Sequence, residues 1–369
     1  MRTLLLTLSL AGCATPLAQA DTQAPETAVD AGMGIVPAGP VVLTGATVLW
    51  PSGAAIGDLH IRAGRIAEPA GDAVGVVTID VTGRFIAPAF IDSHVHLAYL
   101  PEGEALAAGG IAGAVDMAAP ESFLALAHGP LDVSASGPMV TAIGGYPTQS
   151  WGSAGYGLEC ADGAAAASAV TRLVGLGARL IKLPVTGEAG DAQLDDTALG
   201  LAVAEAHRLG VPVASHATGD DEASRAARAG VDVLAHTPTG ALSETTIAAW
   251  GGKTVVTTLV AFGNGTTTRA NLTSLRAAGA RVLYGTDFGN ARTAAINADE
   301  LQGMVDSGMT GEAILAAGTS VPADFWGFDD LGSLDIGKSA SLLVLDADPR
   351  LDPLTLARPV AVYIRGHQR

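Results

Sequence analysis

The chain has 369 residues, of which 49% are apolar and 15% charged, and its formal net charge is −17. This length accommodates a barrel of about 250 residues with a smaller companion domain, and the apolar fraction supplies a large core. The negative charge argues against a basic surface that binds nucleic acids or anionic membranes, so we expect a small-molecule substrate as the partner.

The first 20 residues are typical of a targeting segment. Arg2 precedes a short apolar run at positions 4–10, which is the pattern of an exported protein. The letters LAGC that complete this run resemble a bacterial lipobox, which would make Cys13 a lipidated N-terminus. Because Ala14 rather than an aspartate follows this cysteine, we expect an outer-membrane lipoprotein that faces the periplasm or the exterior.

A second cleavage site stays open as an alternative. The letters AQA at positions 18–20 fit an ordinary signal peptidase, and the protein would then be soluble in the periplasm or secreted. The composition of residues 21–40 predicts a flexible tether. No apolar run reaches the roughly 20 residues of a membrane span, so a lipid anchor would be the only membrane contact. The sequence does not indicate an oligomeric state.

The pattern of apolar runs divides the remaining chain into two predicted domains. Residues 41–85 alternate short apolar runs with glycine-rich turns, which indicates strands. Residues 330–369 return to this pattern, so we expect both ends of the chain to build one discontinuous β-sandwich. Residues 86–329 alternate apolar runs with alanine-rich helical segments, which predicts an α/β fold: a (β/α)8 TIM barrel with a parallel sheet.

The expected barrel elements follow one another regularly along the chain. Helices are predicted at 163–176, 195–209, 219–229, 243–251, 267–279, 297–307 and 310–326. Barrel strands are predicted near 86–92, 111–116, 138–143, 178–183, 211–215, 231–235, 254–260 and 280–285.

Six polar residues lie at or just past the ends of these predicted strands. In a (β/α)8 barrel the C-terminal strand ends converge on one mouth, where such enzymes carry out their chemistry. We therefore expect the six side chains to form a single active site. They are His94, His96, Lys182, His216, His236 and Asp287.

The spacing of these residues favours two divalent metal ions. His94 and His96 are two residues apart on one strand, so their imidazoles share a face and can hold one metal ion. Asp287 adds an oxygen ligand, because the eighth strand of a closed barrel adjoins the first. His216 and His236 end the neighbouring fifth and sixth strands and can hold a second ion.

The two ions need a bridging ligand, and Lys182 is the candidate. Burial lowers the pKa of a lysine, and its neutral amine can then take up carbon dioxide to form an anionic carbamate with two oxygens. Two metal ions about 3.5–4 Å apart can generate a bridging hydroxide at neutral pH and polarise a carbonyl group. Asp287 would accept the hydroxide proton and pass it to the leaving group.

The motifs that carry these residues resemble the amidohydrolase superfamily, in its branch of imidazolonepropionase-like and prolidase-like metal-dependent hydrolases. The resemblance covers about 41–369. It implies that the histidines and the aspartate bind two metal ions, usually zinc, that the lysine is carbamylated, and that the enzyme cleaves carbon–nitrogen bonds. The matching motifs are PAFIDSHVHL, LIKLPV, SHA, AHT, LYGTDFG and LGSLDIGKSASLLVLDADP.

Two departures from the family's patterns bear on the reaction. Thr218 stands where prolidase-like members often have a substrate-contacting tyrosine, which weakens the case for a dipeptidase. Gly219 stands where mononuclear deaminases have a glutamate, and Lys182 is present, which argues against a deaminase. We expect hydrolysis of an amide bond in a dipeptide, an N-acyl amino acid or a cyclic amide. The alternatives are an esterase, lactonase or phosphotriesterase, a mononuclear deaminase, and a non-catalytic envelope binding lipoprotein.

Substrate-binding candidates lie in the loops after the strands. The segment 144–162 is long for a βα loop and carries Tyr146 and Trp151, which could form a substrate wall or simply pack the loop down. Tyr146 could donate its hydroxyl group to a developing oxyanion. Arg292 could bind a substrate carboxylate, although a lone loop arginine more often faces solvent. We expect Cys160 to be an inert thiol.

Overall fold

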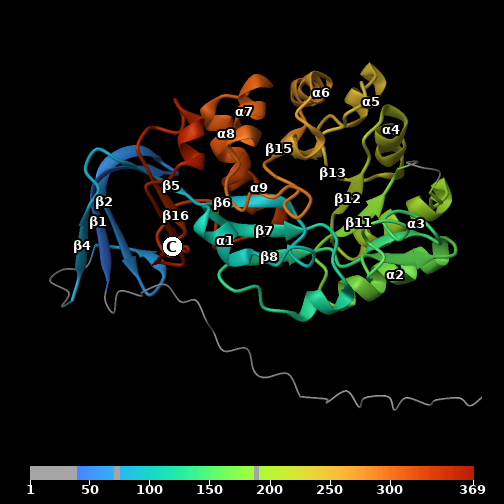
Figure 1. Ribbon diagram of the computed structural model, residues 1–369, viewed down its shortest axis with the longest axis horizontal. Coiled ribbons are helices and arrows are strands. Elements are labelled where there is room, and N and C mark those ends of the chain that lie inside the picture. The colour runs from blue at the N-terminus through green and yellow to red at the C-terminus, as the bar shows by residue number, and fades with distance from the viewer. Residues whose placement is uncertain (1–39, 70–74, 187–190) are drawn as a thin grey trace, which may run out of the picture. The chain divides into compact units, whose positions relative to one another are not determined.

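The structure is a computed structural model that describes residues 40–69, 75–186 and 191–369 (Figure 1). The predicted targeting segment, Cys13 and nearly all of the predicted tether lie outside the described residues, so the lipobox stays a prediction. Within the described ranges, no helix is long and apolar enough to cross a membrane.

One eight-stranded sheet joins the two ends of the chain, and Figure 1 shows β16 beside the N-terminal strands. Its order is β18-β17-β16-β5-β1-β2-β3, with β4 paired to β1. The C-terminal strand β16 pairs antiparallel with β5, which places β16 and β17 beside the strands of residues 41–88. The bounds are β1 Val41–Trp50, β2 Gly53–Arg62, β3 Arg65–Ala67, β4 Val77–Asp80, β5 Phe85–Pro88, β16 Leu342–Leu345, β17 Ala361–Ile364 and β18 His367–Gln368.

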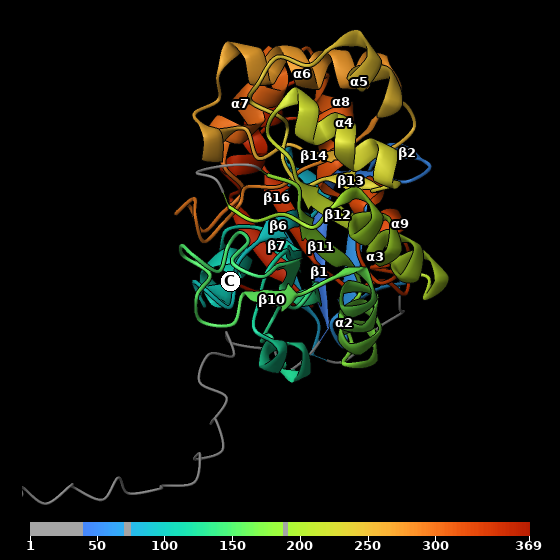
Figure 2. The same cartoon turned by 90° about the vertical axis from the view of Figure 1, so that its right-hand side faces the viewer.

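Two parallel ladders lie among the helices (Figure 2). The first contains β6 (Phe90–Val95), β7 (Ile111–Asp116) and β8 (Asp132–Ala135). Their strands are completely or largely buried, which agrees with their continuous apolar runs. The second ladder contains β11 Ile181–Pro184, β12 Val213–His216, β13 Val233–Leu234, β14 Thr254–Val256 and β15 Arg281–Leu283.

Hydrogen bonds connect the edges of the two ladders, although the strands do not form one continuous closed sheet. At one seam the His96 amide donates to the Phe288 carbonyl over 2.7 Å, and the Asp287 amide donates to the His94 carbonyl over 2.9 Å. At the other seam the Arg179 amide donates to the Ala135 carbonyl over 3.0 Å. The first seam therefore places the segment after β15 directly against the histidine pair.

The helices agree closely with their predicted ranges. The predicted helix at 310–326 is divided at Thr319, because Pro322 in the first turn of the following helix lacks the amide proton that a continuous helix would need. The bounds are α1 Gly103–Ala108, α2 Gly163–Gly175, α3 Asp196–Arg208, α4 Asp220–Ala229, α5 Glu244–Ala249, α6 Thr266–Ala277, α7 Ala298–Asp306, α8 Gly311–Gly318 and α9 Ser320–Trp326, with 3-10 turns η1 Glu121–Ala125, η3 Val260–Phe262 and η4 Pro353–Ala357.

Two strand predictions were wrong in part. Residues 86–88, expected in the first barrel strand, pair with β16 in the eight-stranded sheet, and the barrel strand begins at Phe90. The expected third barrel strand at 138–143 corresponds to β9 (Met139–Ala142), which pairs with β10 (Gly157–Cys160), whereas β8 pairs with β7. Gly137, with φ at +68°, separates β9 from β8, a strand that the sequence did not predict.

Candidate metal centre

The pair of histidines on β6 and the aspartate after β15 meet at the first seam. The Nε2 atom of His96 lies 3.0 Å from Oδ1 of Asp287, and the Nε2 atoms of His94 and His96 are 3.3 Å apart. Ligand atoms of all three residues lie within 4.8 Å of one another, and the three side chains are buried. This arrangement fits the expected first metal site.

Contacts with the backbone orient both sides of this cluster. The Nδ1–H of His94 donates to the carbonyl oxygen of Ala235 over 2.8 Å, which leaves Nε2 as the ligand atom. Asp287 has a φ of +57°, and its backbone N–H donates a hydrogen bond to the His94 carbonyl oxygen. Gly289 allows the closest approach, because a Cβ atom there would lie 2.7 Å from the Cβ of His96.

The other three predicted ligands lie against this cluster. The ring centroid of His236 is 4.5 Å from that of His94 and 4.8 Å from that of His216. His236 Nδ1 lies 3.1 Å from the hydroxyl group of Thr258, which directs Nε2 toward the centre. Lys182 lies on β11 beside β12 and is completely buried. All six side chains line a single cavity of about 450 Å³.

Burial favours the neutral forms of Lys182, His216 and His94. It lowers the pKa of Lys182 to about 7, against the opposing effects of Asp287 and Asp116. Burial also lowers the pKa of His216 to about 4 and that of His94 well below its ordinary value, in both cases assisted by the nearby Lys182. Neutral imidazoles and a neutral amine are the forms that bind metals or take up carbon dioxide.

Two buried atoms show that the donor set fits metal ions. Lys182 Nζ and His216 Nε2 are inaccessible to solvent and have no hydrogen-bond partner in the described part of the chain. An unpaired buried polar group costs about 1–3 kcal/mol, so folded proteins rarely retain one without a function. A second metal ion at His216 and a carbamate on Lys182 would satisfy both atoms.

Two buried carboxylates that were not among the predicted site residues support this centre. Asp116 Oδ2 accepts from the amide of Leu97 over 2.7 Å and so fixes the chain directly after His96. Asp92 Oδ2 accepts from the hydroxyl group of Thr286 over 2.6 Å and so connects β6 to the segment after β15. Asp116 ends β7, so the same strand-end pattern that indicated the ligands could have indicated it.

Aromatic side chains form the outer wall of the cavity. Tyr146 and Trp151 both line it, and the indole nitrogen of Trp151 donates to the Tyr146 hydroxyl over 2.8 Å. Phe262, which sequence analysis did not single out, packs with its ring centroid 4.8 Å from that of His236. Arg292 is not among the described lining residues, because it is exposed and its guanidinium lies 5.9 Å from the Tyr99 ring centroid.

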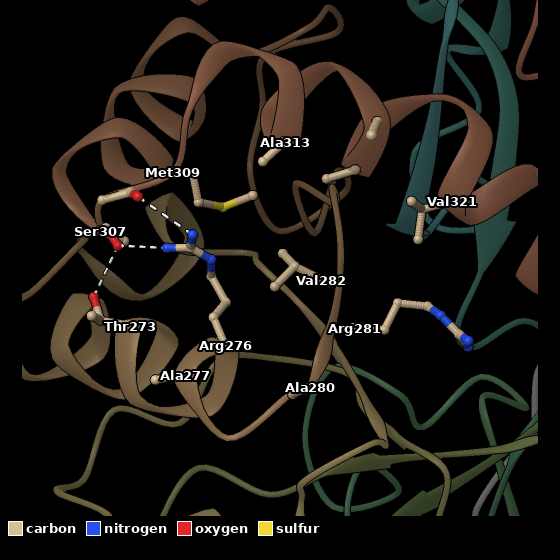
Figure 3. A pocket seen from close by; sticks show the side chains of 13 residues that line it. Thr273, Arg276, Ala277, Ala280, Arg281, Val282, Ser307, Met309, Ala313 and Val321 are labelled. Atoms are coloured by element: carbon tan, nitrogen blue, oxygen red, sulfur yellow. Dashed lines mark hydrogen bonds between the residues drawn. The ribbon is translucent and has the colours of Figure 1, made fainter. Parts of the chain in front are cut away.

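A larger cavity of about 630 Å³ lies away from the six ligands, between α6, α8 and the start of β15 (Figure 3). Figure 3 shows an Arg276 guanidinium in this cavity that donates to the Ser307 carbonyl over 2.9 Å. The described lining residues include no histidine, cysteine or carboxylate. This cavity therefore lacks the groups that hydrolytic chemistry needs, and the smaller one is the candidate active site.

A comparison with protein families decides the classification. Residues 85–368, which are more than half of the chain, match the amidohydrolase family. The chain belongs to the amidohydrolase family. Membership in this family implies a hydrolase that uses divalent metal ions. Family membership agrees with the resemblance that the motifs around the six ligands indicated.

Solved structures show the fold of this amidohydrolase at low sequence identity. A Xaa-Pro dipeptidase with bound methionine is 19% identical, with a TM-score of 0.75, and the match covers 89% of this chain and 99% of the other. A putative prolidase from Bifidobacterium longum is 23% identical, with a TM-score of 0.74, over 91% and 95% of the two chains. Molinate hydrolase is 20% identical, with a TM-score of 0.71, over 92% and 95%. These matches support a TIM-barrel-type α/β fold.

A curated relative matches only a short part of the amidohydrolase. Adenine deaminase 1 of Rhizobium etli is 37% identical over 73 residues, which are 20% of this chain and 13% of that protein. A match of this length does not determine the reaction.

Proposed function

We propose that this amidohydrolase is a binuclear enzyme that hydrolyses an amide bond in a dipeptide, an N-acyl amino acid or a cyclic amide. The observation that carries the proposal is the position of Lys182. Its buried, unpaired Nζ atom lines the same cavity as the cluster of His94, His96 and Asp287 and as the neighbouring His216 and His236. A mononuclear site would leave this amine without a partner.

The ligands divide into two groups in this proposal. His94, His96 and Asp287 would hold one divalent ion, and His216 and His236 the second, with a carbamate on Lys182 shared between them. Nitrogen and carboxylate ligands of this kind suit zinc. Such ions, when bound, would lower the pKa of a water molecule and polarise the scissile carbonyl group.

Asp287 has the properties of a group that moves the proton. Burial opposes its ionisation, but its contacts with His94, His96 and Asn290 hold the pKa of the carboxyl at about 2, so it is ionised at neutral pH. An ionised carboxylate can accept a proton from the attacking water and deliver it to the leaving amine. The reaction then needs no covalent intermediate with the protein.

The same cavity could serve other reactions, and the local match to adenine deaminase 1 raises the question of a deaminase. Gly219 provides no side chain where a deaminase-type glutamate would act, and the cluster retains Lys182. We therefore place amide hydrolysis before deamination. Hydrolysis of esters, lactones or phosphotriesters is the second candidate, because an activated water attacks these bonds as well.

Metal content is the first measurement. The protein is purified with zinc and bicarbonate beside Lys182→Ala, with Lys253→Ala as the control because Lys253 instead donates to the carbonyl of Val231. We expect about two ions per chain in the wild type and the control, and fewer in Lys182→Ala. One ion in all three would indicate a mononuclear enzyme, and almost none would favour a non-catalytic binding lipoprotein. Dipeptides, N-acyl amino acids and lactones are then screened for turnover.

We further propose that the protein is exported and anchored in the outer membrane through a lipid on Cys13. The support is the LAGC sequence after a short apolar run. Mass spectrometry of the mature N-terminus tests this, since a diacylated Cys13 supports the anchor. A mature chain that begins at Asp21 would instead indicate a soluble periplasmic or secreted protein.

For the domain organisation, we infer a closed barrel that begins at Phe90 and extends to 329, and a discontinuous β-sandwich from 41–88 and 330–369. The hydrogen bonds at both seams and the pairing of β16 with β5 support this division. Limited proteolysis tests this division. If residues 330–369 stay bound to residues 41–88 after the chain is cleaved between them, the division is supported. If the two fragments dissociate, it is contradicted.

A further inference from the structure

The cavity has a marked division of charge between its floor and its wall. The floor consists of the six predicted ligands. Apart from these, the described lining residues include a single carboxylate, that of Asp191, and no arginine or second lysine. A substrate that reaches the metal centre therefore meets a negative charge at the wall.

Asp191 is available to a ligand. It is half-buried, and it forms no hydrogen bond or ion pair with any other residue that the structure describes. Its neighbour Ala192 lies close to the loop that carries Tyr146 and Trp151. The closeness is seen at Gly145, where a Cβ atom would lie 2.6 Å from the Ala192 carbonyl oxygen. The carboxylate thus belongs to the same wall as Tyr146, which follows Gly145 in the chain.

The aromatic rings of this wall are held in place. The Trp151 indole donates to the Tyr146 hydroxyl over 2.8 Å, and its ring packs edge-on against His96 with centroids 5.2 Å apart. Phe262 lies across the cavity beside His236. Aromatic rings and a carboxylate that line one cavity both attract cations, the rings through their quadrupole and the carboxylate through direct charge attraction.

The positive group that a substrate carboxylate would need lies outside the cavity. Arg292 is exposed, and its guanidinium lies over Tyr99 rather than among the described lining residues. Thr218 is also turned away, since its hydroxyl donates to Glu222 over 3.2 Å. Asp191 would repel an anionic substituent beside it, and no arginine is among the described lining residues to offset that repulsion.

We propose that Asp191 selects amide substrates that carry a protonated amine in the part that contacts the outer wall, and that it disfavours substrates with a carboxylate there. This proposal rests on the amide hydrolysis proposed above and narrows its substrate class. Asp191 acts as a specificity residue: it binds the cationic group and leaves the bond-breaking step to the groups at the floor.

Three p-nitroanilides of equal length test the charge preference. The 3-aminopropanoyl, butanoyl and succinyl derivatives place an ammonium group, a methyl group and a carboxylate at the same distance from the scissile bond. For the zinc-loaded enzyme we expect kcat/KM to fall in that order, with about tenfold between ammonium and methyl, which is typical of one partly exposed charge contact. Asp191→Asn should remove this preference, and Asp191→Glu should retain it.

A matched control separates the local effect from the net charge. Asp221 is exposed on α4 and outside the cavity lining, so Asp221→Asn also removes one negative charge and should keep the preference. The proposal is wrong if the succinyl compound is the best substrate, or if Asp191→Asn leaves the ratio of ammonium to methyl unchanged.

Calorimetric binding of the three corresponding primary amides to the zinc-loaded enzyme distinguishes this proposal from the proposed function. Tighter binding of the ammonium compound, lost in Asp191→Asn, supports the role of Asp191 even without turnover, in which case amide hydrolysis is the part that fails. Turnover or binding without a charge preference overturns the role of Asp191 and leaves amide hydrolysis standing. If none of the three compounds binds or is turned over, the proposed role of Asp191 is overturned as well.

Discussion

Replacing Lys182 with methionine should stabilise the metal-free protein and abolish its metal-bridged centre. The side chain is completely buried, and burial lowers its pKa from 10.5 to about 7. Each unit of pKa shift corresponds to about 1.4 kcal/mol, so the charged lysine lowers the free energy of unfolding by about 5 kcal/mol. Methionine has a similar length and carries no charge, so it removes this penalty.

The penalty has a defined dependence on pH. Between about pH 7 and pH 10.5 the unfolded chain retains the lysine proton while the folded metal-free protein has lost it. The unfolded state then binds more protons, and wild-type stability rises with pH through this window. The gain from Lys182→Met should therefore be about 5 kcal/mol near pH 6 and only about 1 kcal/mol near pH 10.

Urea denaturation in the presence of a chelator measures this difference, with Lys253→Met as a control at a partly exposed lysine. Adding zinc should reverse the order, because ligands that bind only the folded state stabilise it by mass action and the wild type alone retains both sites. The reasoning is refuted if the metal-free variant is less stable than the wild type near pH 6, or if its gain does not shrink as the pH rises.

Three further predictions follow from particular contacts. Asp287→Asn should lower kcat at least about 100-fold while circular dichroism shows an intact fold, and unchanged turnover would exclude its proton-transfer role. Gly289→Ala places a Cβ atom 2.7 Å from that of His96 at a φ of +114°, so zinc competition should show weaker binding; unaltered affinity would mean that the backbone relaxes freely. Burial raises the pKa of Glu300 from 4.5 to about 7, so the folded protein keeps this proton up to a higher pH than the unfolded chain does. The free energy of unfolding therefore falls as the pH rises from about 4.5 to 7. In urea titrations the free energy of unfolding of Glu300→Gln, relative to that of the wild type, should rise across this pH range by up to about 3 kcal/mol. A difference that does not change with pH would contradict the raised pKa of Glu300.

The sequence predicted most of the helices and most of the strands that carry the ligands. Helices such as α3 and α6 begin and end within one or two residues of their expected limits. Apolar periodicity and end residues are local properties, so they can be recognised without knowing the fold. The helix at 310–326 shows the limit, because its division at Thr319 depends on the position of one proline within a continuous apolar pattern.

The sequence also predicted that six polar side chains meet at one place in the fold. Each of them lies on a buried strand or just past its end, and parallel strands in a barrel bring their C-terminal ends to one mouth. The structure places His94, His96, Lys182 and Asp287 in one cavity, as that geometry requires. Their roles as metal ligands stay predictions until metal content is measured.

Only the tertiary structure decided what surrounds this centre. Arg292 was the candidate for a substrate charge, but it lies outside the cavity, where its guanidinium meets Tyr99, whereas Asp191 and Phe262 line the cavity. Loop conformations depend on contacts between segments far apart in the chain, and no periodic pattern encodes them. The amino-acid sequence by itself determined which groups end the barrel strands and hence the chemistry of the floor, while long-range packing decided which charge a substrate meets at the wall.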